Sequence, residues 1–339
     1  MHNHPKVSVV ILNWNGKSYL EKFLPSVISP GYPNLEIVVG DNASTDDSIA
    51  FVREKFPEIR ILENQTNLGF AGGYNAVLSQ VDSDYFVLLN SDVEVTLNWI
   101  EPVITLMESD ALIAAAQPKL KDWNNKNRFE YAGAAGGFID KFGYPFCRGR
   151  VFDTLEDDQG QYDQTSEIFW ASGAALFIKK PYWDEVGGFD ADFFAHMEEI
   201  DLCWRLKNKG YKVMYCPEST VYHVGGGTLN VENPFKTYLN FRNNLAMLLK
   251  NTSSNKVFGV LFIRFWLDFI GLLKFVAEGK FKHAAAINKA HIQFFKNLGR
   301  DKKKRVNAGS AINPAGLFNG SVVWEYFGKK RKHFKEIVR

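Results

Sequence analysis

Three polar residues that close a predicted strand are the first candidates for chemistry. The apolar run of residues 86–89 stops at Asn90, Ser91 and Asp92. In open α/β sheets ligands bind outside the carboxyl ends of the strands, so Asp92 stands where chemistry is expected. If the ligand carries phosphates, this carboxylate is suited to hold Mg²⁺ or Mn²⁺, since both ions prefer oxygen ligands. An Asp that only caps the next helix would fit the same pattern.

Two earlier predicted strands end in the same way. The first apolar run of the chain ends at Asn13 and Asn15, and the second ends at Asp41 and Asn42. Each run is followed by a stretch with helical spacing, and strands that alternate with helices predict a parallel sheet. The carboxyl ends of its strands would bring these polar side chains to one edge.

A glycine-rich stretch precedes the strand that delivers Asp92. It places Gly69 and Gly72 between Asn67 and Asn75 and opens a helical pattern. Glycines let a backbone approach a ligand closely, and a helix N-terminus favours an anion. The stretch lacks the G-x-G-x-x-G spacing, so a simple turn into a helix is the alternative.

A second acidic group falls in the first turn of a helix that the apolar spacing predicts from residue 197 onward. It consists of Glu198, Glu199 and Asp201. Acidic side chains at a helix N-terminus are favourable in any protein, which is the plain alternative to a catalytic role. Asp201 and Arg205 are four residues apart, so we expect them to pair and to be structural. Glu198 and Glu199 point about 100° apart on a helix, so they cannot both serve as the catalytic base.

Small residues and a lone histidine complete the candidates. Gly173 and Ala174 lie in the middle of a strand predicted over residues 168–180 and would let a ligand approach the backbone, although packing under a helix explains them equally well. His223 ends a strand and is followed by glycines, which is not a pattern typical of a core residue.

Composition limits the class of protein. The 339 residues suffice for one large domain and a smaller appendage, and the formal net charge of +2 indicates no nucleic-acid partner. The three cysteines are widely spaced and form no C-x-x-C motif, which argues against a disulfide framework or a zinc site. The first residues lack the apolar core of a signal peptide, so we expect a cytoplasmic protein.

The composition changes near residue 231. Residues 257–295 are very apolar at first but include Arg264, Asp268 and Lys274, so a transmembrane helix is not expected. An interfacial or dimer-forming helix fits better. Basic runs at 300–305 and 329–335 would suit the inner face of a cell membrane, while a solvated tail is the alternative.

Four segments carry a resemblance to a known family. They are VVILNWN at 9–15, GDNASTDDS at 40–48, NLGFAGGYN at 67–75 and LLNSD at 88–92. In this order and spacing they resemble the nucleotide-binding half of family 2 glycosyltransferases, inverting enzymes of GT-A fold, and are most similar to a bacterial rhamnosyltransferase-like subgroup. The resemblance covers about the first two thirds of the chain. It implies an α/β fold with a mostly parallel sheet flanked by helices.

The resemblance also implies roles on the donor side. Asp41 would bind a uracil or thymine ring, the loop after Asn13 would line the nucleoside, and residues 67–75 would help to close the pocket. Asp92 would be the last member of a D-x-D-type metal motif whose first member is Asn90 here. The full donor set comprises Asn13, Asn15, Asp41, Asn42, Asn67, Gly69, Gly72, Asn75, Asn90, Ser91, Gly173 and Ala174.

The acidic helix matches the subgroup's E-D-x-D pattern, except that Glu199 replaces the Asp at the second position. The resemblance assigns that position to proton abstraction, so Glu199 is the expected catalytic base. His223 becomes a candidate metal ligand beside Asp92. Glu198 is left on the acceptor side or in a structural role. The pair Arg242-Asn243 matches a short signature of the subgroup, and the sequence gives it no role.

Together these features predict a metal-dependent inverting glycosyltransferase that moves a sugar from a UDP- or dTDP-activated donor to a hydroxyl of a glycan or a lipid-linked glycan. Residues 1–230 would form the GT-A domain, with a nucleotide-sugar half (1–112) and an acceptor half (113–230). Residues 231–339 would form a helical, basic C-terminal extension. A sugar-nucleotide nucleotidyltransferase and a catalytically inactive glycan-binding or scaffold protein are the alternatives.

Overall fold

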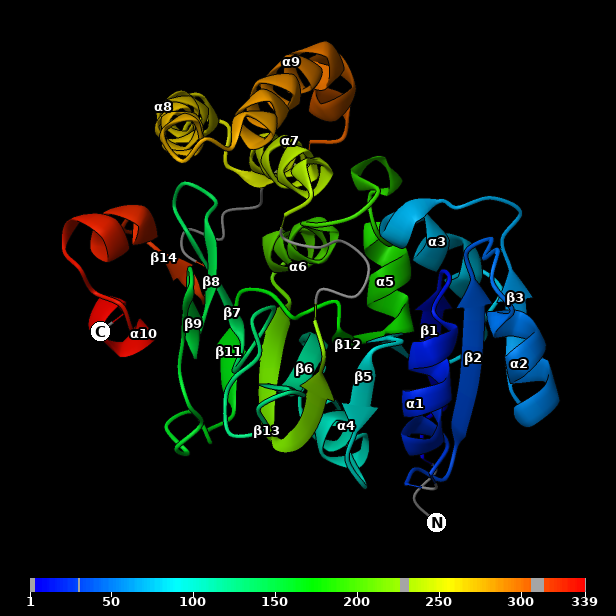
Figure 1. Cartoon of the computed structure of the whole chain (residues 1–339). Helices are drawn as coiled ribbons and strands as arrows, with labels where there is room; N and C mark the ends of the chain where they lie inside the picture. Colours follow the sequence, from blue (N-terminus) through cyan, green and yellow to red (C-terminus); the bar gives the residue numbers. More distant parts are fainter. Residues whose placement is uncertain (1–3, 30, 226–231, 306–313, 339) are drawn as a thin grey trace.

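A nine-stranded sheet runs through the computed structural model, which describes residues 4–29, 31–225, 232–305 and 314–338 (Figure 1). Its main path has the order β11-β13-β6-β12-β4-β1-β2-β3, and β5 pairs with β13. The strands are β1 (Val7–Asn13), β2 (Leu35–Asp41), β3 (Arg60–Glu63), β4 (Tyr85–Asn90), β5 (Val93–Val95), β6 (Ile113–Asp122), β11 (Ser166–Ile168), β12 (Ala175–Lys179) and β13 (Lys212–His223).

Helices cover both faces of this sheet because its central strands are apolar on both sides. In β1, Val9 and Ile11 join one core cluster and Val10 joins the other, as the two-residue period of a strand requires. The first cluster takes in α1 (Lys17–Ile28), α2 (Ser48–Lys55) and α4 (Glu101–Glu108). The second takes in α3 (Gly69–Leu78), α5 (Lys180–Val186) and α6 (Glu198–Asn208).

The predicted parallel core is confirmed in β1 to β4. β1 pairs in parallel with both β2 and β4, whereas β12 runs antiparallel to β4 and β6. The strand predicted over residues 168–180 is wrong in one respect. It divides into β11, which pairs with β13, and β12, which pairs with β4, because the chain crosses from one edge of the sheet to its middle between them.

A small second sheet joins the acceptor half to the C-terminal tail. It has the order β10-β9-β8-β7-β14, with β7 (Gly137–Asp140), β8 (Pro145–Cys147), β9 (Arg150–Val151), β10 (Thr154–Leu155) and β14 (Leu317–Phe318). A π-helix (Trp324–Gly328) and α10 (Phe334–Ile337) follow β14. The carboxylate of Asp140 accepts a hydrogen bond from the Val322 amide at 2.9 Å, and the Phe334 ring packs against Phe138 and Phe146. The tail therefore returns to the small sheet.

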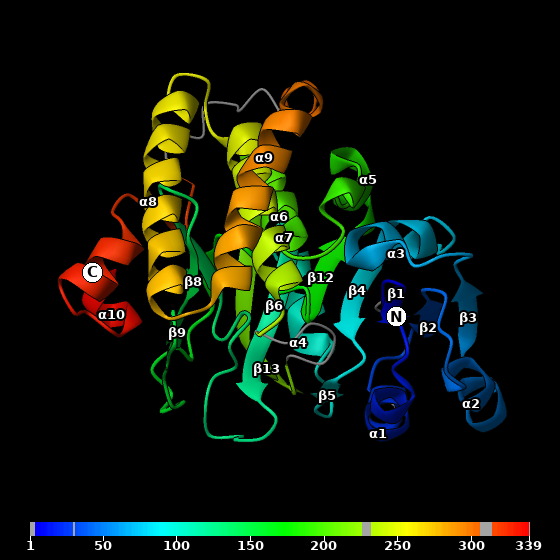
Figure 2. The same cartoon turned by 45° about the horizontal axis from the view of Figure 1, so that its top comes forward.

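Three long helices stack outside α6: α7 (Pro234–Asn251), α8 (Val257–Ala277) and α9 (Phe281–Lys303) (Figures 1 and 2). The apolar stretch of residues 257–295 is thus two helices, which separate at Gly279, a residue with φ of 71°. In the described part of the chain no helix has the length and apolarity needed to cross a bilayer. The expected domain boundary at residue 230 lies outside the described residues.

Candidate functional site

The carboxyl ends of β1, β2 and β4 lie side by side and carry the first group of predicted site residues. Asn13 is the register partner of Asp41, and Leu12 is the partner of Asn90. The Asn13 amide nitrogen donates to the Asp41 carboxylate at 3.1 Å and to the Ser48 hydroxyl at 2.9 Å. Both Asn13 and Asp41 are buried. The sequence pattern therefore placed these polar strand ends correctly at one edge.

The single oxygen of the Asn13 side-chain amide, Oδ1, is buried and has no hydrogen-bond partner among the described residues. A Cβ at Gly16 would lie 2.6 Å from it, so only glycine leaves this oxygen uncovered. Buried polar atoms are normally paired, and an unpaired acceptor indicates a place for a donor that is not part of the chain. The N–H group of a ligand ring fits this position.

The loops that follow β1 and β2 are tied to each other. Asn15, at φ of 52°, accepts hydrogen bonds from the Thr45 and Asp46 amides at 2.7 and 3.2 Å. The Asn42 amide nitrogen donates to Asn67 Oδ1 at 3.0 Å. Asn15, Asn42 and Asn67 thus order the loops around Asp41.

The glycine-rich stretch has a packing role that the sequence did not predict. Gly69 has a φ of 71°, and a Cβ there would lie 2.5 Å from Phe194. A Cβ at Gly72 would meet Leu68 at 3.1 Å. Asn75 binds the Phe189 backbone with both ends of its amide, at 2.8 and 3.0 Å. Gly69 and Asn75 hold α3 against residues 189–194, and the place of a Cβ at Gly72 also lies 3.9 Å from Ala191. Their donor contacts stay a prediction.

Asp92 and His223 meet although 131 residues separate them. β13 delivers His223 to the end of β4, and its Nε2 lies 3.1 Å from Asp92 Oδ1 and 3.3 Å from the Asn90 amide nitrogen. The other ring nitrogen, Nδ1, lies 3.1 Å from Glu130 Oε1. Burial alone would lower the pKa of His223, but the two carboxylates raise it to about 10. Burial would likewise raise the pKa of Asp92, yet His223 lowers it.

The facing pair of Asp92 and His223 fits two adjacent ligands of one divalent cation. Ligands bound about 2.1 Å from an octahedral ion at right angles lie about 3.0 Å apart, close to the observed 3.1 Å between oxygen and nitrogen. Within the described ranges no three His, Cys, Asp or Glu side chains form a group that could hold a metal ion. His223 contacts Asp92 and Glu130 through opposite ring nitrogens, so these three side chains do not face one point. Water and substrate phosphates would have to complete such a site.

The acidic helix α6 begins directly after a strained turn. Phe194, His196 and Met197 all have φ between 66° and 73°, a region that residues other than glycine rarely adopt. The Asn243 amide nitrogen of α7 donates to the carbonyls of Phe193, Ala195 and His196, at 2.9, 2.9 and 2.7 Å. This supplies the structural role of the Arg242-Asn243 pair, because Asn243 holds the turn from which Glu198 and Glu199 project.

Glu198 and Glu199 each have a buried carboxylate oxygen, Oε2, without a hydrogen-bond partner among the described residues. Burial raises the pKa of Glu199 to about 7. Burial, and then the neighbouring Glu199, raise the pKa of Glu198 well above its ordinary value. A carboxyl group whose pKa lies near neutral pH, as that of Glu199 does, is suited to exchange a proton with a substrate.

Asp201 and Arg205 form the predicted ion pair, with 2.8 Å between Arg205 Nε and Asp201 Oδ2. Lys250 and Asn251 of α7 contact the same carboxylate at 2.9 and 2.8 Å. Burial would raise the pKa of Asp201, but Lys250 and Arg205 outweigh it and lower the pKa. Asp201 is therefore a poor base and a structural anchor between α6 and α7.

Gly173 and Ala174 connect the two acidic groups. A Cβ at Gly173 would lie 3.9 Å from the Cβ of Glu199, and the carbonyl of Ala174 accepts a hydrogen bond from the Asn90 amide at 3.0 Å. The Cα atoms of adjacent residues such as Gly173 and Ala174 are about 3.8 Å apart. The Glu199 side chain and the end of β4 therefore flank the same two-residue segment. A Cβ at Gly16 would lie 3.5 Å from the Ser91 hydroxyl, which brings the loop after β1 to this edge as well.

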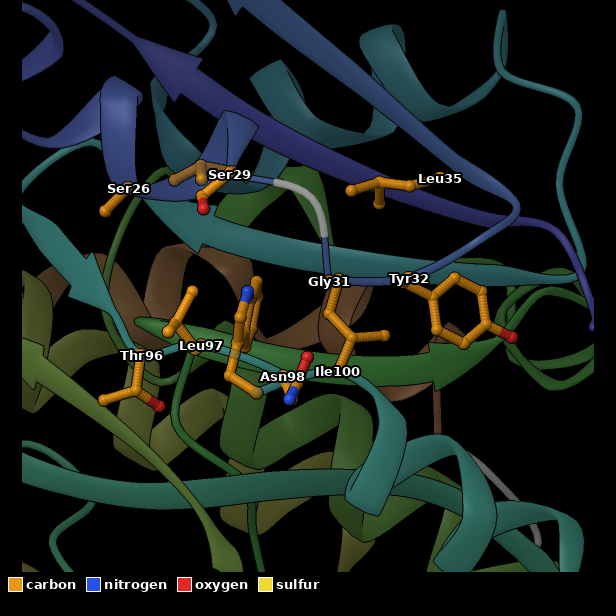
Figure 3. Close-up of a pocket in the computed structure, with 11 residues that line it drawn as sticks. Ser26, Ser29, Gly31, Tyr32, Leu35, Thr96, Leu97, Asn98 and Ile100 are labelled. Atoms are coloured by element: carbon orange, nitrogen blue, oxygen red, sulfur yellow. The ribbon is translucent and has the colours of Figure 1, made fainter.

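A small hollow elsewhere does not belong to this site (Figure 3). It lies near the amino end of β2, the opposite end from Asp41, and Tyr32 is its only lining residue with an ionisable side chain. Its lining consists of Ser26, Val27, Ser29, Gly31, Tyr32, Leu35, Thr96, Leu97, Asn98, Trp99 and Ile100. None of these is a predicted site residue.

Sequence reasoning missed two residues of the site. Glu130 lies in an irregular polar stretch and reaches His223 only through long-range pairing, in which its amide donates to the Leu120 carbonyl at 3.1 Å. No local pattern marks it. Asn243 did carry a signal, the Arg242-Asn243 pair, but its contacts lie nearly fifty residues away and could not be read from the chain.

Comparison with known proteins identifies the family. The model of glycosyl transferase family 2 matches residues 8–185, which is more than half of the chain. The N-acetylglucosaminyl-diphospho-decaprenol L-rhamnosyltransferase of Mycobacterium tuberculosis is 24% identical over 233 residues, 63% of this chain and 75% of that protein. The low-salt glycan biosynthesis hexosyltransferase of Haloferax volcanii is 20% identical over 74% of this chain and 76% of its own length.

Solved structures share the fold at low identity. A mannosyltransferase from Pyrobaculum calidifontis, in complex with GDP-Man and Mn²⁺, has a TM-score of 0.54 and 16% identity over 90% of this chain and 85% of that chain. GalNAc-T7 with UDP, GalNAc and Mn²⁺ has a TM-score of 0.56 and 17% identity over 73% of this chain and 48% of that chain. The chain has the GT-A fold, belongs to glycosyl transferase family 2, and is a nucleotide-sugar-dependent enzyme of this inverting family.

Proposed function

We propose that the chain transfers a sugar from a UDP- or dTDP-activated donor to a hydroxyl of a glycan or lipid-linked glycan, with inversion and with a divalent cation. The observation that carries this proposal is the position of Glu199. Its carboxylate has an oxygen without a hydrogen-bond partner in the part of the chain that the structure describes, and burial raises its pKa to about 7. The residue flanks the Gly173–Ala174 segment opposite the end of β4. The proposed base and the sheet edge that would bind the donor are separated by one short segment, which suits transfer of a sugar from the donor to an acceptor beside the base.

The donor base is proposed to lie against Asn13 and Asp41. The unpartnered Asn13 Oδ1 and the Asp41 carboxylate present buried acceptors, and the ring N–H of uracil or thymine is a matching donor. The interlocked Asn15, Asn42 and Asn67 hold the loops around this pocket. This recognition fits either pyrimidine.

Asp92 and His223 are the proposed protein ligands of Mg²⁺ or Mn²⁺, with Asn90 and Ser91 beside the donor phosphates. When bound, the cation neutralises charge on the leaving nucleoside diphosphate. The 3.1 Å spacing of the two side chains supports this assignment, as do the Mn²⁺-containing structures of two relatives of the same fold. Glu130 holds the imidazole from its other side, as carboxylates do behind metal-bound histidines.

Glu199 is the proposed general base. It takes the proton of the acceptor hydroxyl while that oxygen forms a bond to the anomeric carbon, and the bond from this carbon to the diphosphate oxygen breaks on the opposite face. A single displacement of this kind inverts the anomeric centre. A general base works best when its pKa lies near the operating pH, which the raised pKa of Glu199 provides. Asp201, paired with Arg205 and Lys250, stays out of this step.

A lipid-linked acceptor is the finer part of the proposal. The mycobacterial relative is named for a sugar carried on diphospho-decaprenol, which supports an acceptor of the same kind here. We place the enzyme in the cytoplasm at the inner face of the cell membrane. The three cysteines, all buried and unpaired, fit a reducing compartment.

Product analysis tests the proposed reaction. The full chain is given UDP-, dTDP- and GDP-sugars with Mn²⁺, and release of the nucleoside diphosphate is measured with and without simple glycoside acceptors. We expect turnover with a UDP- or dTDP-sugar, and a product of inverted anomeric configuration by NMR. Turnover of GDP-sugars alone, or pyrophosphate release from a nucleoside triphosphate and a sugar phosphate, would contradict it. So would a retained configuration. Donor binding without turnover across the acceptor panel would favour the inactive alternative.

A further inference from the structure

Helix α8 buries two of its three charged side chains, Arg264 and Asp268, and exposes Lys274 together with many apolar side chains. Arg264 and Asp268 are 3% and 0% exposed, whereas Phe258, Trp266 and Ile270 are 82%, 59% and 61% exposed. In a water-soluble helix the apolar stripe normally faces the core. The reversed arrangement indicates that the outer face of α8 contacts something other than water.

The inward side of α8 is fixed by a polar network. Arg264 Nε donates to Asp268 Oδ1 at 2.6 Å and also binds Asn244 of α7. Asp268 Oδ2 lies 3.1 Å from His291 of α9, and the Tyr144 hydroxyl donates to Asp268 Oδ1 at 3.3 Å. Removing one partner of a buried ion pair is costly, so the helix cannot rotate to hide its apolar face.

The exposed apolar side chains of α8 form one continuous stripe. Their spacing of three to four residues keeps them on one side of the helix for about 27 Å, at 1.5 Å per residue. The stripe consists of Phe258, Phe262, Trp266, Phe269, Leu273 and Val276, and it is widened by Ile263 and Ile270. Both views show α8 at the margin of the molecule (Figures 1 and 2).

The stripe extends onto neighbouring elements. The Phe295 ring of α9, 57% exposed, stacks on Phe265 of α8 at 5.3 Å. The ring of Phe327, which follows the exposed Trp324 by three residues in the π-helix, lies 5.6 Å from Lys274 Nζ. A contiguous apolar surface of this extent marks an interaction site. We call the stripe on α8 together with Phe295, Trp324 and Phe327 the α8 face.

The charge around the α8 face identifies its occupant. Residues 251–339 contain 18 Lys and Arg against 5 Asp and Glu, a formal charge of +13, although the whole chain carries only +2. Arg300 and Lys304 pair with Asp190 and Asp192, which still leaves the region strongly basic. Lys274 Nζ and Lys332 Nζ lie 5.6 and 5.7 Å from the Phe327 ring of this face, and apolar side chains combined with Lys are complementary to an anionic bilayer surface. Two copies joined through this face would bring like charges together.

We propose that the chain docks on anionic bilayers through the α8 face, with α8 lying in the plane of the headgroups and its apolar side chains in the acyl boundary. The proposal rests on neither the donor site nor catalysis. It places the enzyme where a lipid-linked acceptor would be presented.

Flotation of the full chain tests the docking. The probes are vesicles of phosphatidylcholine alone and of phosphatidylcholine mixed with phosphatidylglycerol. We expect the protein to float with the mixed vesicles, to float less at high salt, and to lose roughly tenfold or more in partitioning when Trp266→Ser and Ile270→Ser are combined. The matched control combines Leu97→Ser and Leu112→Ser, which are 75% and 48% exposed and far from α8 in the sequence, and should float like the wild type.

Three results would overturn the proposal. The first is a full chain that fails to float with the mixed vesicles. The second is equal flotation of the wild type and the Trp266/Ile270 variant, which would mean adsorption by charge alone. The third is a dimer in light scattering that the same double substitution dissociates, since a second copy would then cover the α8 face. Far-UV circular dichroism and thermal unfolding check that both variants are folded.

Discussion

Glu199→Gln removes one ionisable group from the proposed site while keeping its size. If Glu199 takes the acceptor proton, kcat should fall by about 10²–10⁴, the usual contribution of a general base. Donor Kd should barely change, because the residue flanks Gly173 rather than the nucleotide edge. Glu199→Asp places the carboxylate about one methylene short and should retain part of the activity.

The same substitution should stabilise the protein at alkaline pH. Burial raises the pKa of Glu199 from 4.5 to about 7, so the folded state holds its proton more tightly than the unfolded state. The stability from this group is fully present below pH 4.5 and is lost as the pH rises through 7. A shift of this size corresponds to about 3 kcal/mol in the free energy of unfolding, at about 1.4 kcal/mol per pH unit. Gln carries no charge and avoids this loss.

Two assays on the same proteins test these expectations. Steady-state kinetics from pH 5 to 9 should show kcat/KM of the wild type rising through about pH 7, with that limb absent in the variant. Denaturant unfolding should show the variant more stable than the wild type at pH 8.5, with the difference vanishing near pH 4.5. Glu198→Gln, on the same helical turn, is the control. Wild-type turnover in Glu199→Gln together with an inactive Glu198→Gln would refute the assignment of the base.

Three other substitutions test the remaining parts of the site. Asp92→Asn should abolish Mn²⁺-dependent binding of UDP or dTDP in calorimetry with an unchanged circular dichroism spectrum, and unchanged affinity would mean that the metal assignment is wrong. Asn243→Ala deletes three hydrogen bonds to the strained turn and should lower kcat while donor Kd is unaffected. Asn240→Ala on the same helix should leave both constants unchanged. Equal kinetics in the two variants would mean that the turn does not position the catalytic residues. Gly69→Ala should lower the free energy of unfolding by about 1–2 kcal/mol or more, as measured with denaturant, because its φ is 71° and the new Cβ has no room. Gly259→Ala, which places its Cβ in open space on a helix, should be neutral or stabilising.

The strand-end part of the site could be predicted because its signals are local. A buried strand that stops at polar residues fixes where Asn13, Asp41 and Asp92 lie, since parallel strands end at one edge. The first turn of α6 follows in the same way from its acidic residues and apolar spacing. The ion pair between Asp201 and Arg205 needs only the helical period.

Other parts depend on contacts between distant segments. Gly69 looks like a phosphate-loop glycine in the sequence, yet its neighbour is Phe194, more than a hundred residues away. Glu130 reaches His223 only because the stretch after β6 folds back to the carboxyl end of β13. In α8 the sequence shows charges inside an apolar helix, but which face is exposed depends on the partners of Arg264, which lie on other elements. Tertiary packing decides each of these.

A thermal-shift panel on the wild type measures whether the chain binds a UDP- or dTDP-sugar together with a divalent cation. The full chain is melted with UDP-, dTDP- and GDP-sugars, each with and without Mn²⁺, and a ligand of the native state raises Tm by an amount that grows as RT ln(1 + [L]/Kd). We expect a clear rise in Tm with a UDP- or dTDP-sugar, and a larger rise in the presence of Mn²⁺. A rise with GDP-sugars only, or shifts that are equal with and without Mn²⁺, would contradict it.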